Sequence, residues 1–211
     1  MNIDEEFKII KEFVDTGEAL FKKPGKKAKY KYGDKKHLES LKQSFLRGRN
    51  TKINISEPET ITDEALWEYI KLKKKLTDDK VNELSKYHKI AMSIETKIGS
   101  LLEGFIFKYI SKHDWIWCSG NILQDIDFIK KDIDENQNIT WVLLQVKNSD
   151  NSENSASARV RVGTNIIKWY RRFSKIKDKD NWSELVKIVK ENDKDLIQNL
   201  SEKNYVKYLK S

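Results

Sequence analysis

The residue types best able to do chemistry are grouped in two short segments. Residues 123–129 and 141–147 alternate in character and are separated by a polar turn, which predicts two β-strands. Residues two apart in a strand share a face, so each segment is expected to present one pair of polar side chains together. These pairs are Asp125 with Asp127, and Gln145 with Lys147. If the strands pair, a carboxylate, a carboxamide and an amine converge where a hard divalent cation could lie beside a phosphate.

Hydrolysis of a phosphodiester suits this set of groups. The reaction needs a metal that neutralises developing charge, a positioned water, and a group that favours hydroxide. Asp127, the side-chain oxygen of Gln145 and the backbone carbonyl of Val146 could hold the metal, and Lys147 could orient or help deprotonate the water. Asp125 is a further candidate ligand, and its alternative is an ordinary surface position on the strand.

Helices are predicted around these strands. Apolar residues recur at helical spacing from Ile94 to Tyr109, with Glu103 on the opposite side of the wheel, where it faces either solvent or the site. Further helices are expected, and the four that precede residue 90 form a predicted helical subdomain (1–90) before a catalytic core (91–211). Their ranges are 3–21, 38–46, 62–72, 78–88, 182–191 and shorter pieces to Leu209.

A basic segment covers residues 22–36. It holds eight lysines, one aspartate and a Pro-Gly turn signal, with two tyrosines among the lysines. Such a loop could lie along a phosphate backbone while its tyrosines contact sugar or base. A solvated loop without a ligand is the alternative.

A polar segment follows the second strand, and residues 148–173 are the expected DNA-recognition segment. Asn can bond adenine, Arg can bond guanine and Glu can accept from cytosine. The candidates are Asn148, Asn151, Glu153, Asn154, Ser155, Arg159, Arg161 and Thr164. Thr164 or Asn165 is then expected to cap a helix over residues 166–173 whose polar side holds phosphates. Those cations are Lys168, Arg171 and Arg172. The alternative is a polar loop that satisfies its own backbone.

Composition favours a nucleic-acid partner over a membrane surface. The 211 residues carry a formal charge of +8, and no basic amphipathic segment dominates. No apolar run approaches 18 residues, and the first residues lack the apolar region of a signal peptide, so a cytoplasmic location is expected. The lone Cys118 excludes an internal disulfide. Structural roles are expected for Cys118, the three histidines and Trp115, Trp117, Trp141 and Trp169.

The ordered motifs resemble the PD-(D/E)xK nuclease superfamily in its Gln-x-Lys variant. Gly99 to Glu103 matches its helical Gly-x-x-x-Glu pattern, Asp127 its strand-end aspartate, and Gln145-Val-Lys147 its ligand and lysine. The resemblance implies an α/β fold, with a central mixed β-sheet flanked by helices, and Mg²⁺-dependent catalysis by Asp127, Gln145, Lys147 and Glu103. Two departures are Ile126, where a proline is usual, and the neutral Gln145. Asp125 or Glu103 would then supply a second carboxylate.

More narrowly, four blocks resemble SinI-type restriction endonucleases. They are Trp117-Cys-Ser-Gly, Asp127-Phe-Ile, residues 145–155 and residues 161–169. The resemblance implies a type II enzyme that cuts double-stranded DNA at GGWCC or a related palindrome, leaves 5′-phosphates, and has a cognate DNA methyltransferase in the same restriction-modification system. A homodimer is expected, with a monomer as the alternative. Two other readings are a repair or junction nuclease with the same core, and a non-catalytic DNA-binding module.

Overall fold

The computed structural model describes residues 1–50, 63–150, 165–177 and 179–211. The chain divides into two compact units. Unit 1 combines residues 1–51 with 100–211, and unit 2 consists of residues 52–99. This grouping places the first two helices with the β-sheet, so it differs from a boundary near residue 90. Each unit is described by itself.

Unit 1 is built on a mixed four-stranded sheet, which confirms the predicted architecture. Its strands lie in the order β1-β2-β3-β4. The pairs β1·β2 and β2·β3 are antiparallel, whereas β3·β4 is parallel. The strands are β1 (Trp115–Trp117), β2 (Phe128–Ile133), β3 (Ile139–Ser149) and β4 (Ile166–Arg172).

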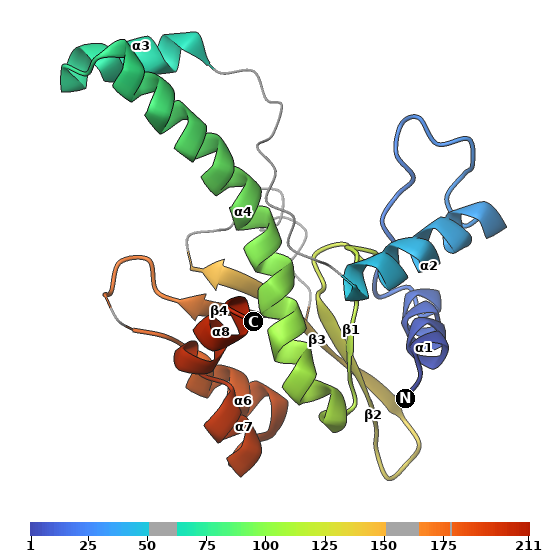
Figure 1. Ribbon diagram of the computed structural model, residues 1–211. Helices are drawn as coiled ribbons and strands as arrows, with labels where there is room; N and C mark the ends of the chain where they lie inside the picture. The colour runs from blue at the N-terminus through green and yellow to red at the C-terminus, as the bar shows by residue number, and fades with distance from the viewer. Residues whose placement is uncertain (51–62, 151–164, 178) are drawn as a thin grey trace. The chain divides into compact units, whose positions relative to one another are not determined.

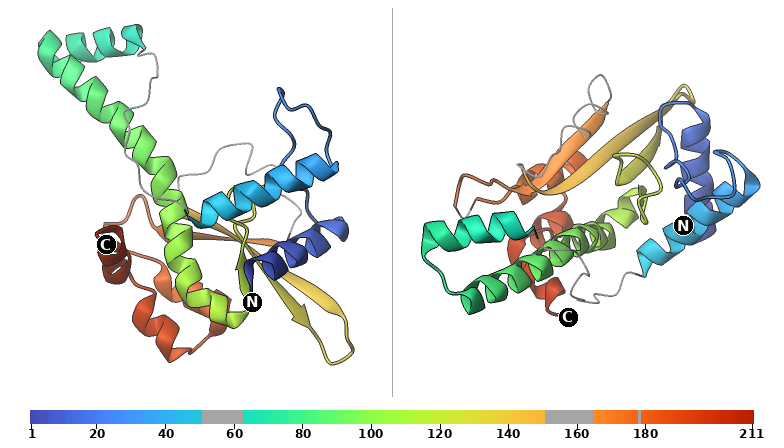
Figure 2. Two further views of the ribbon diagram at one scale, coloured as in Figure 1. Left: turned by 45° about the vertical axis from the view of Figure 1, so that its right-hand side comes forward. Right: turned by 90° about the horizontal axis from the view of Figure 1, so that it is seen from above.

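Helices cover both faces of this sheet (Figures 1 and 2). On one face, Leu144 and Val146 of β3 pack against the C-terminal part of α4 (Asp78–Ile110) and against the helices at the end of the chain. On the other face, Leu143 and Ile129 pack against α1 (Ile3–Asp15) and α2 (Lys35–Arg49). Because side chains alternate along a strand, β3 contributes its even-numbered residues to the first core and its odd-numbered ones to the second.

Most helices begin and end within a few residues of the predicted positions, but α1 ends at Asp15, six residues before the predicted end. The expected helices over 78–88 and 94–109 form one continuous helix, α4. The full set is α1 (Ile3–Asp15), α2 (Lys35–Arg49), α3 (Glu64–Lys74), α4 (Asp78–Ile110), a 3₁₀ turn (Ser111–His113), α6 (Trp182–Lys190), α7 (Lys194–Asn199) and α8 (Glu202–Leu209). Within the described residues, no helix has both the length and the apolar character needed to cross a membrane.

Residues 166–172 form strand β4, so the predicted helix there was wrong. The apolar positions 166, 167, 169 and 170 fit a helical stripe, but the two isoleucines and two aromatic residues also favour a strand. Pairing with β3 decides between them, because Gln145 is opposite Lys168 and Val146 is opposite Trp169. Trp169 is buried in the core as a result.

Strand β2 begins at Phe128, five residues later than predicted. Leu123 forms only an isolated bridge to Phe21, and Asp125 adopts a left-handed backbone with φ 58°. An aspartate tolerates this conformation better than most residues, and it interrupts the extended chain. Asp125 and Asp127 therefore do not share the face of one regular strand.

Unit 2 is a helical hairpin formed by α3 and the N-terminal part of α4. Asp63 caps α3 by accepting the backbone N–H of Leu66 at 3.2 Å. An ion pair joins Lys71 to Asp78 across the connection, and the rings of Trp67 and His88 lie 6.0 Å apart. These contacts close the hairpin at one end and along its length.

Two glycines allow α2 to lie directly against the turn that follows β1. A Cβ atom on Gly48 would lie 2.2 Å from the backbone nitrogen of Gly120, and a Cβ on Gly120 would lie 2.1 Å from the carbonyl oxygen of Ser44. Gly120 also has a φ of +75°, which disfavours other residues. Ser119 completes this contact by donating its hydroxyl to the carbonyl of Phe45 at 2.8 Å.

We therefore expect Gly48→Ala to destabilise the protein by about 2 kcal/mol, because backbone atoms cannot move aside as a flexible side chain can. Gly25→Ala is the matched control, since a Cβ atom there would meet nothing within 4 Å. Urea unfolding followed by tryptophan fluorescence measures both. Equal midpoints for the two variants would show that the close backbone approach is not needed.

Candidate active site

Asp127 is held at the point where β2 meets its two neighbours. Its backbone N–H donates to the carbonyl of Leu144 at 3.0 Å, and its own carbonyl accepts the N–H of Cys118 at 2.8 Å. Its Oδ2 accepts the backbone N–H of Val146 at 2.7 Å. The N–H and C=O of a strand residue point to the same side, so the Val146 carbonyl is also directed toward Asp127.

Strand β3 presents Gln145 and Lys147 on one face, as the spacing predicted. Gln145 is 2% exposed, and its amide nitrogen donates to Oδ1 of Asp125 at 3.3 Å. Lys147 lowers the pKa of Asp127 through its positive charge, and Asp125 raises the same pKa through its negative charge. The two aspartates, the glutamine and the lysine are thus brought together although Asp125 lies outside the regular strand.

Glu103 reaches the same group from helix α4. Its Oε2 accepts the indole N–H of Trp117 at 2.8 Å. Burial raises the pKa of Glu103 to about 8, with a further increase from the charge of Asp127, whereas the Trp117 bond and Lys147 act in the opposite direction. The side chain is partly exposed, yet protein atoms remove most of the water around its carboxyl group. The carboxyl group of Glu103 therefore interacts with the charges of Asp127 and Lys147 and does not face solvent alone.

Burial also raises the pKa of Asp127, to about 6, despite the Val146 N–H and the charge of Lys147. Two carboxyl groups thus lie near each other in a poorly hydrated place with one nearby ammonium group. Their ionised forms are costly there unless a further cation is present. The arrangement favours binding of a positive ion.

The donor set fits Mg²⁺ chemically. Within the described residues, no three or more His, Cys, Asp or Glu side chains are grouped as a metal site. Mg²⁺ does not need such a group, because it commonly binds one or two carboxylates and keeps waters or substrate phosphates as its other ligands. Asp127 and the Val146 carbonyl would supply protein oxygens, with Gln145 or Asp125 beside them.

Arg49 connects the helices of the opposite face to this site. Its Nη2 donates to the carbonyl of Trp117 at 2.7 Å and pairs with Glu6 at 2.5 Å. The guanidinium lies 5.1 Å from the Trp117 ring centroid and 4.1 Å from that of Phe107. No pattern in the sequence indicated a role for Arg49. Trp117 belongs to one of the blocks that carried the family resemblance, although its bond to Glu103 was not anticipated.

The expected DNA-contacting residues have different positions. Asn148 follows Lys147 on β3, and its buried Oδ1 has no hydrogen-bond partner within the described residues. Lys168 is opposite Gln145, and Arg172 is exposed opposite Ser149. The other candidates lie outside the described residues; they are Asn151, Glu153, Asn154, Ser155, Arg159, Arg161 and Thr164.

Arg171 has a structural partner in place of the phosphate contact that was expected of it. It is buried, pairs with Glu202 of α8, and lies 5.1 Å from the ring centroid of Tyr205. The helix prediction had put Arg171 on a polar side, whereas the alternation of β4 turns it toward the core. It links β4 to the C-terminal helices.

The mixed sheet flanked by helices is that of an α/β nuclease core, and the helical glutamate, the aspartate and the Gln-x-Lys segment resemble the PD-(D/E)xK class. Comparison with known proteins is consistent with this class and narrows it. The model of the SinI restriction endonuclease family matches residues 2–211. The chain is 31% identical to the type II restriction enzyme Eco47I of Escherichia coli over 210 residues, covering 99% of this chain and 86% of that enzyme.

A second relative is the type II restriction enzyme SinI of Salmonella infantis. It is 34% identical over 181 residues, which cover 85% of this chain and 76% of that enzyme. The chain belongs to the SinI restriction endonuclease family. It is accordingly a type II restriction endonuclease, which is a site-specific deoxyribonuclease.

The raised pKa of Glu103 predicts how the stability of the metal-free protein depends on pH. The folded protein keeps a proton that the unfolded chain loses near pH 4.5, so the free energy of unfolding falls as pH rises from about 4.5 to about 8. Glu103→Gln removes this loss. In EDTA, we expect the variant's melting temperature to exceed that of the wild type by about 3 °C or more at pH 8.5, and by much less at pH 5.

Calorimetry at the two pH values tests this expectation. Added Mg²⁺ at pH 8.5 should raise the wild-type melting temperature more than that of Glu103→Gln, because the cation offsets the buried charge. A difference between variant and wild type that is the same at both pH values would show that ionisation of Glu103 does not destabilise the fold.

Trp117 and Trp115 provide a matched pair for testing the bond to Glu103. Both are buried in β1, but the indole N–H of Trp115 has no hydrogen-bond partner within the described residues. Trp117→Phe should therefore lower the cleavage rate about tenfold and raise the Mg²⁺ concentration needed for half-maximal rate. Trp115→Phe should change neither quantity. Equal effects would mean that the Trp117 indole contributes by packing alone.

Proposed function

We propose that this protein hydrolyses double-stranded DNA in a Mg²⁺-dependent reaction at a short specific sequence, GGWCC or a related palindrome. The observation that supports this most directly is the bond from the Val146 N–H to Asp127, which brings the aspartate against the Gln-Val-Lys segment. The family to which the chain belongs supports DNA as the substrate. The reaction would take place in the cytoplasm.

Each residue of the site has a proposed role. Bound Mg²⁺ would neutralise charge on the scissile phosphate and make its bound water more acidic. Asp127, the Val146 carbonyl and Gln145 hold the cation, and Asp125 orients Gln145 through their hydrogen bond. Lys147 orients the attacking water and stabilises hydroxide beside the phosphate. Glu103 adds the second carboxylate that compensates for the neutral Gln145.

Recognition is proposed to lie on the continuation of β3. Asn148 begins this segment next to Lys147. Its buried amide oxygen has no hydrogen-bond partner among the described residues, which suits a base-edge or water contact. Lys168 and Arg172 on β4 would hold phosphates. The same roles are proposed for residues of 151–164 that lie outside the described part: Asn151, Glu153, Asn154, Ser155, Arg159, Arg161 and Thr164.

Cleavage of both strands of a palindrome needs two sites or two successive events, and we propose a homodimer that presents one site to each strand. A cognate DNA methyltransferase would protect the host's own sites as a partner in the restriction-modification system. Residues 91–211 would carry catalysis and recognition, and residues 1–90 would support them.

Incubation with a plasmid of known sequence tests the proposal. With Mg²⁺ we expect discrete fragments whose ends map to one short motif and carry 5′-phosphates. Asp127→Asn and Lys147→Ala should each lower cutting at least a hundredfold while binding to the same fragment in Ca²⁺ persists. Lys130→Ala, from the neighbouring strand, is the control, because this lysine pairs with Asp132 outside the site.

The other readings give different results in the same assay. Cutting of branched or mismatched DNA with plain duplex spared would favour a repair or junction nuclease. Specific binding without cleavage in any divalent metal, unaffected by Lys147→Ala, would favour a DNA-binding module. Absence of cutting under varied salt and metal, with the protein folded, would refute the proposed reaction.

A further inference from the structure

A strongly basic segment runs from residue 22, after α1, to residue 36 in the first turn of α2. Eight lysines and one aspartate give residues 22–36 a formal charge of +7, against +8 for the whole chain. Residues 141–177 contribute another +6, which leaves −5 for the rest. All eight lysines of the first segment are exposed, and within the described residues no carboxylate pairs with their ammonium groups.

This segment, which we call the lysine loop, is closed by a buried histidine. The backbone N–H of Gly33 donates to Nδ1 of His37 at 3.1 Å, so the ring proton must be on Nε2. That nitrogen donates to the carbonyl of Lys22 at 2.9 Å. One imidazole therefore joins both ends of the loop, and Gly33 accommodates the turn with a φ of +83°.

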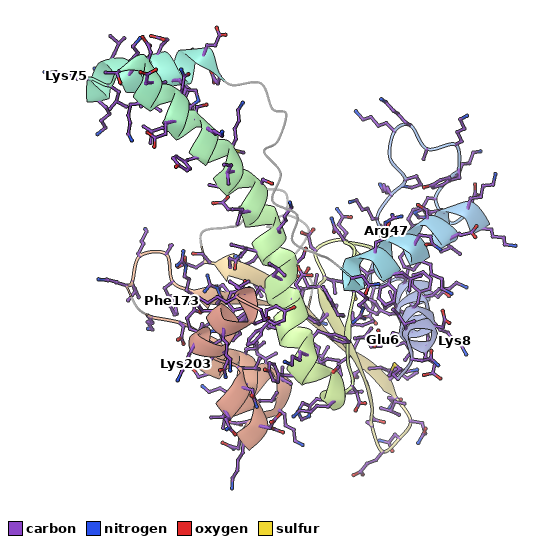
Figure 3. The ribbon with its side chains drawn as sticks, viewed as in Figure 1. Glu6, Lys8, Arg47, Lys75, Phe173 and Lys203 are labelled. Carbon is purple, nitrogen blue, oxygen red and sulfur yellow. The ribbon has the colours of Figure 1, made fainter. Side chains whose placement is uncertain are left out.

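The two tyrosines of the loop fasten it further. The hydroxyl of Tyr30 donates to Oγ of Ser40 at 2.9 Å, and that of Tyr32 accepts the backbone N–H of Phe21 at 3.1 Å. Their rings lie 6.0 and 5.1 Å from the ring of His37. Both hydroxyls are used inside the protein, whereas sugar or base contacts were expected of these residues. The lysines are thus the groups that the loop directs outward (Figure 3).

The base of the loop is tied to the segment that carries the site aspartates. The backbone N–H of Lys22 donates to the carbonyl of Ile122 at 2.8 Å, and Phe21 pairs with Leu123 in an isolated bridge. Asp127 follows Ile122 by five residues, a span of about 17 Å at most. Figure 1 shows the loop, coloured blue, projecting beyond α2.

We propose that the lysine loop is a preformed binding surface for the DNA phosphate backbone beside the cleavage site, and that it reads no sequence. The proposal rests on the proposed function, which supplies duplex DNA as the substrate. Lysines are point charges suited to phosphates, whereas the other polar side chains of the loop are bonded within the protein: Asp34 accepts the backbone N–H of Lys31 at 2.8 Å, and both tyrosine hydroxyls are hydrogen-bonded. Closure by His37 lowers the entropy lost when DNA binds.

Neutralising four lysines at the loop tip tests the electrostatic part. For Lys23, Lys26, Lys27 and Lys29 changed together to Gln, we expect binding to a mixed-sequence duplex in EDTA to weaken at least tenfold at about 0.1 M salt. The slope of log affinity against log salt should shrink by about 2 to 4, since each lost phosphate contact removes about 0.9. Fluorescence anisotropy across a salt series measures both quantities.

A control with the same loss of charge separates local contact from net charge. Lys190, Lys194, Lys203 and Lys207 are exposed on or beside the C-terminal helices, and changing these four to Gln should leave the slope nearly as in the wild type. An equal loss of slope in both variants would overturn the proposal. So would a loss confined to DNA carrying the cleaved motif, because the loop would then read sequence.

The contribution of the two tyrosine hydrogen bonds to closing the lysine loop is tested by Tyr30→Phe combined with Tyr32→Phe. This variant keeps every lysine and both aromatic rings. We expect roughly three- to tenfold weaker binding with an unchanged salt slope, because only preorganisation is lost. Wild-type affinity in this variant would refute the role of closure. If the wild type bound no DNA at any salt, the proposed function itself would fail; if it bound and cut while the four-lysine variant matched it, only the lysine loop proposal would fail.

Discussion

The structure depends on the burial of two carboxyl groups, Asp127 and Glu103, near each other in a place with little water. Burial raises the pKa of both, and the charge of Asp127 raises the pKa of Glu103 further. The fold tolerates them by giving each one fixed donor: the Val146 N–H for Asp127 and the Trp117 indole for Glu103. A pair of packed apolar side chains in the same position would destabilise the folded state less. A bound cation would recover the stability given up here, which is the compromise expected at a functional site.

The rest of unit 1 can be understood as the support for those two donors. Val146 is positioned by the sheet, whose two cores pack on alternate residues of β3. Trp117 is positioned by Arg49, which bonds its carbonyl and faces its ring while Glu6 balances the charge. This contact requires α2 to approach the turn after β1 at backbone distance, and Gly48 and Gly120 permit that approach. A glutamate on one face of the sheet is thus held in place by an arginine from the other.

Local patterns in the sequence were enough to predict the elements on which the chemistry lies, but not their connections. Strand β3 and the Gln145–Lys147 pair follow from alternation, and the C-terminal part of α4 follows from its apolar stripe. Strand β4 could not be predicted in this way, because its apolar residues fit both the helical and the strand period. Only the pairing with β3 distinguishes the two structures. The left-handed Asp125 and the Arg49–Trp117–Glu103 connection depend on residues 14 to 68 positions apart, which no local pattern records. Family resemblance supplied Glu103, whose wheel position alone was ambiguous.

The positions of the basic segments suggest how affinity and specificity are divided. The lysine loop is bonded to Ile122, which precedes Asp127, and the polar segment begins at Asn148, directly after Lys147 on β3. The two proposed DNA contacts therefore adjoin the two ends of the chain segment that carries Asp127, Gln145 and Lys147. Contacts to phosphate give affinity without sequence information, whereas base contacts discriminate. Binding energy from the loop is available on any DNA, so it cannot by itself favour cleavage of one sequence. If both proposals hold, discrimination would come from the segment continuous with Gln145 and Lys147, because a base contact that shifts β3 would also shift Lys147 and the Val146 N–H that holds Asp127.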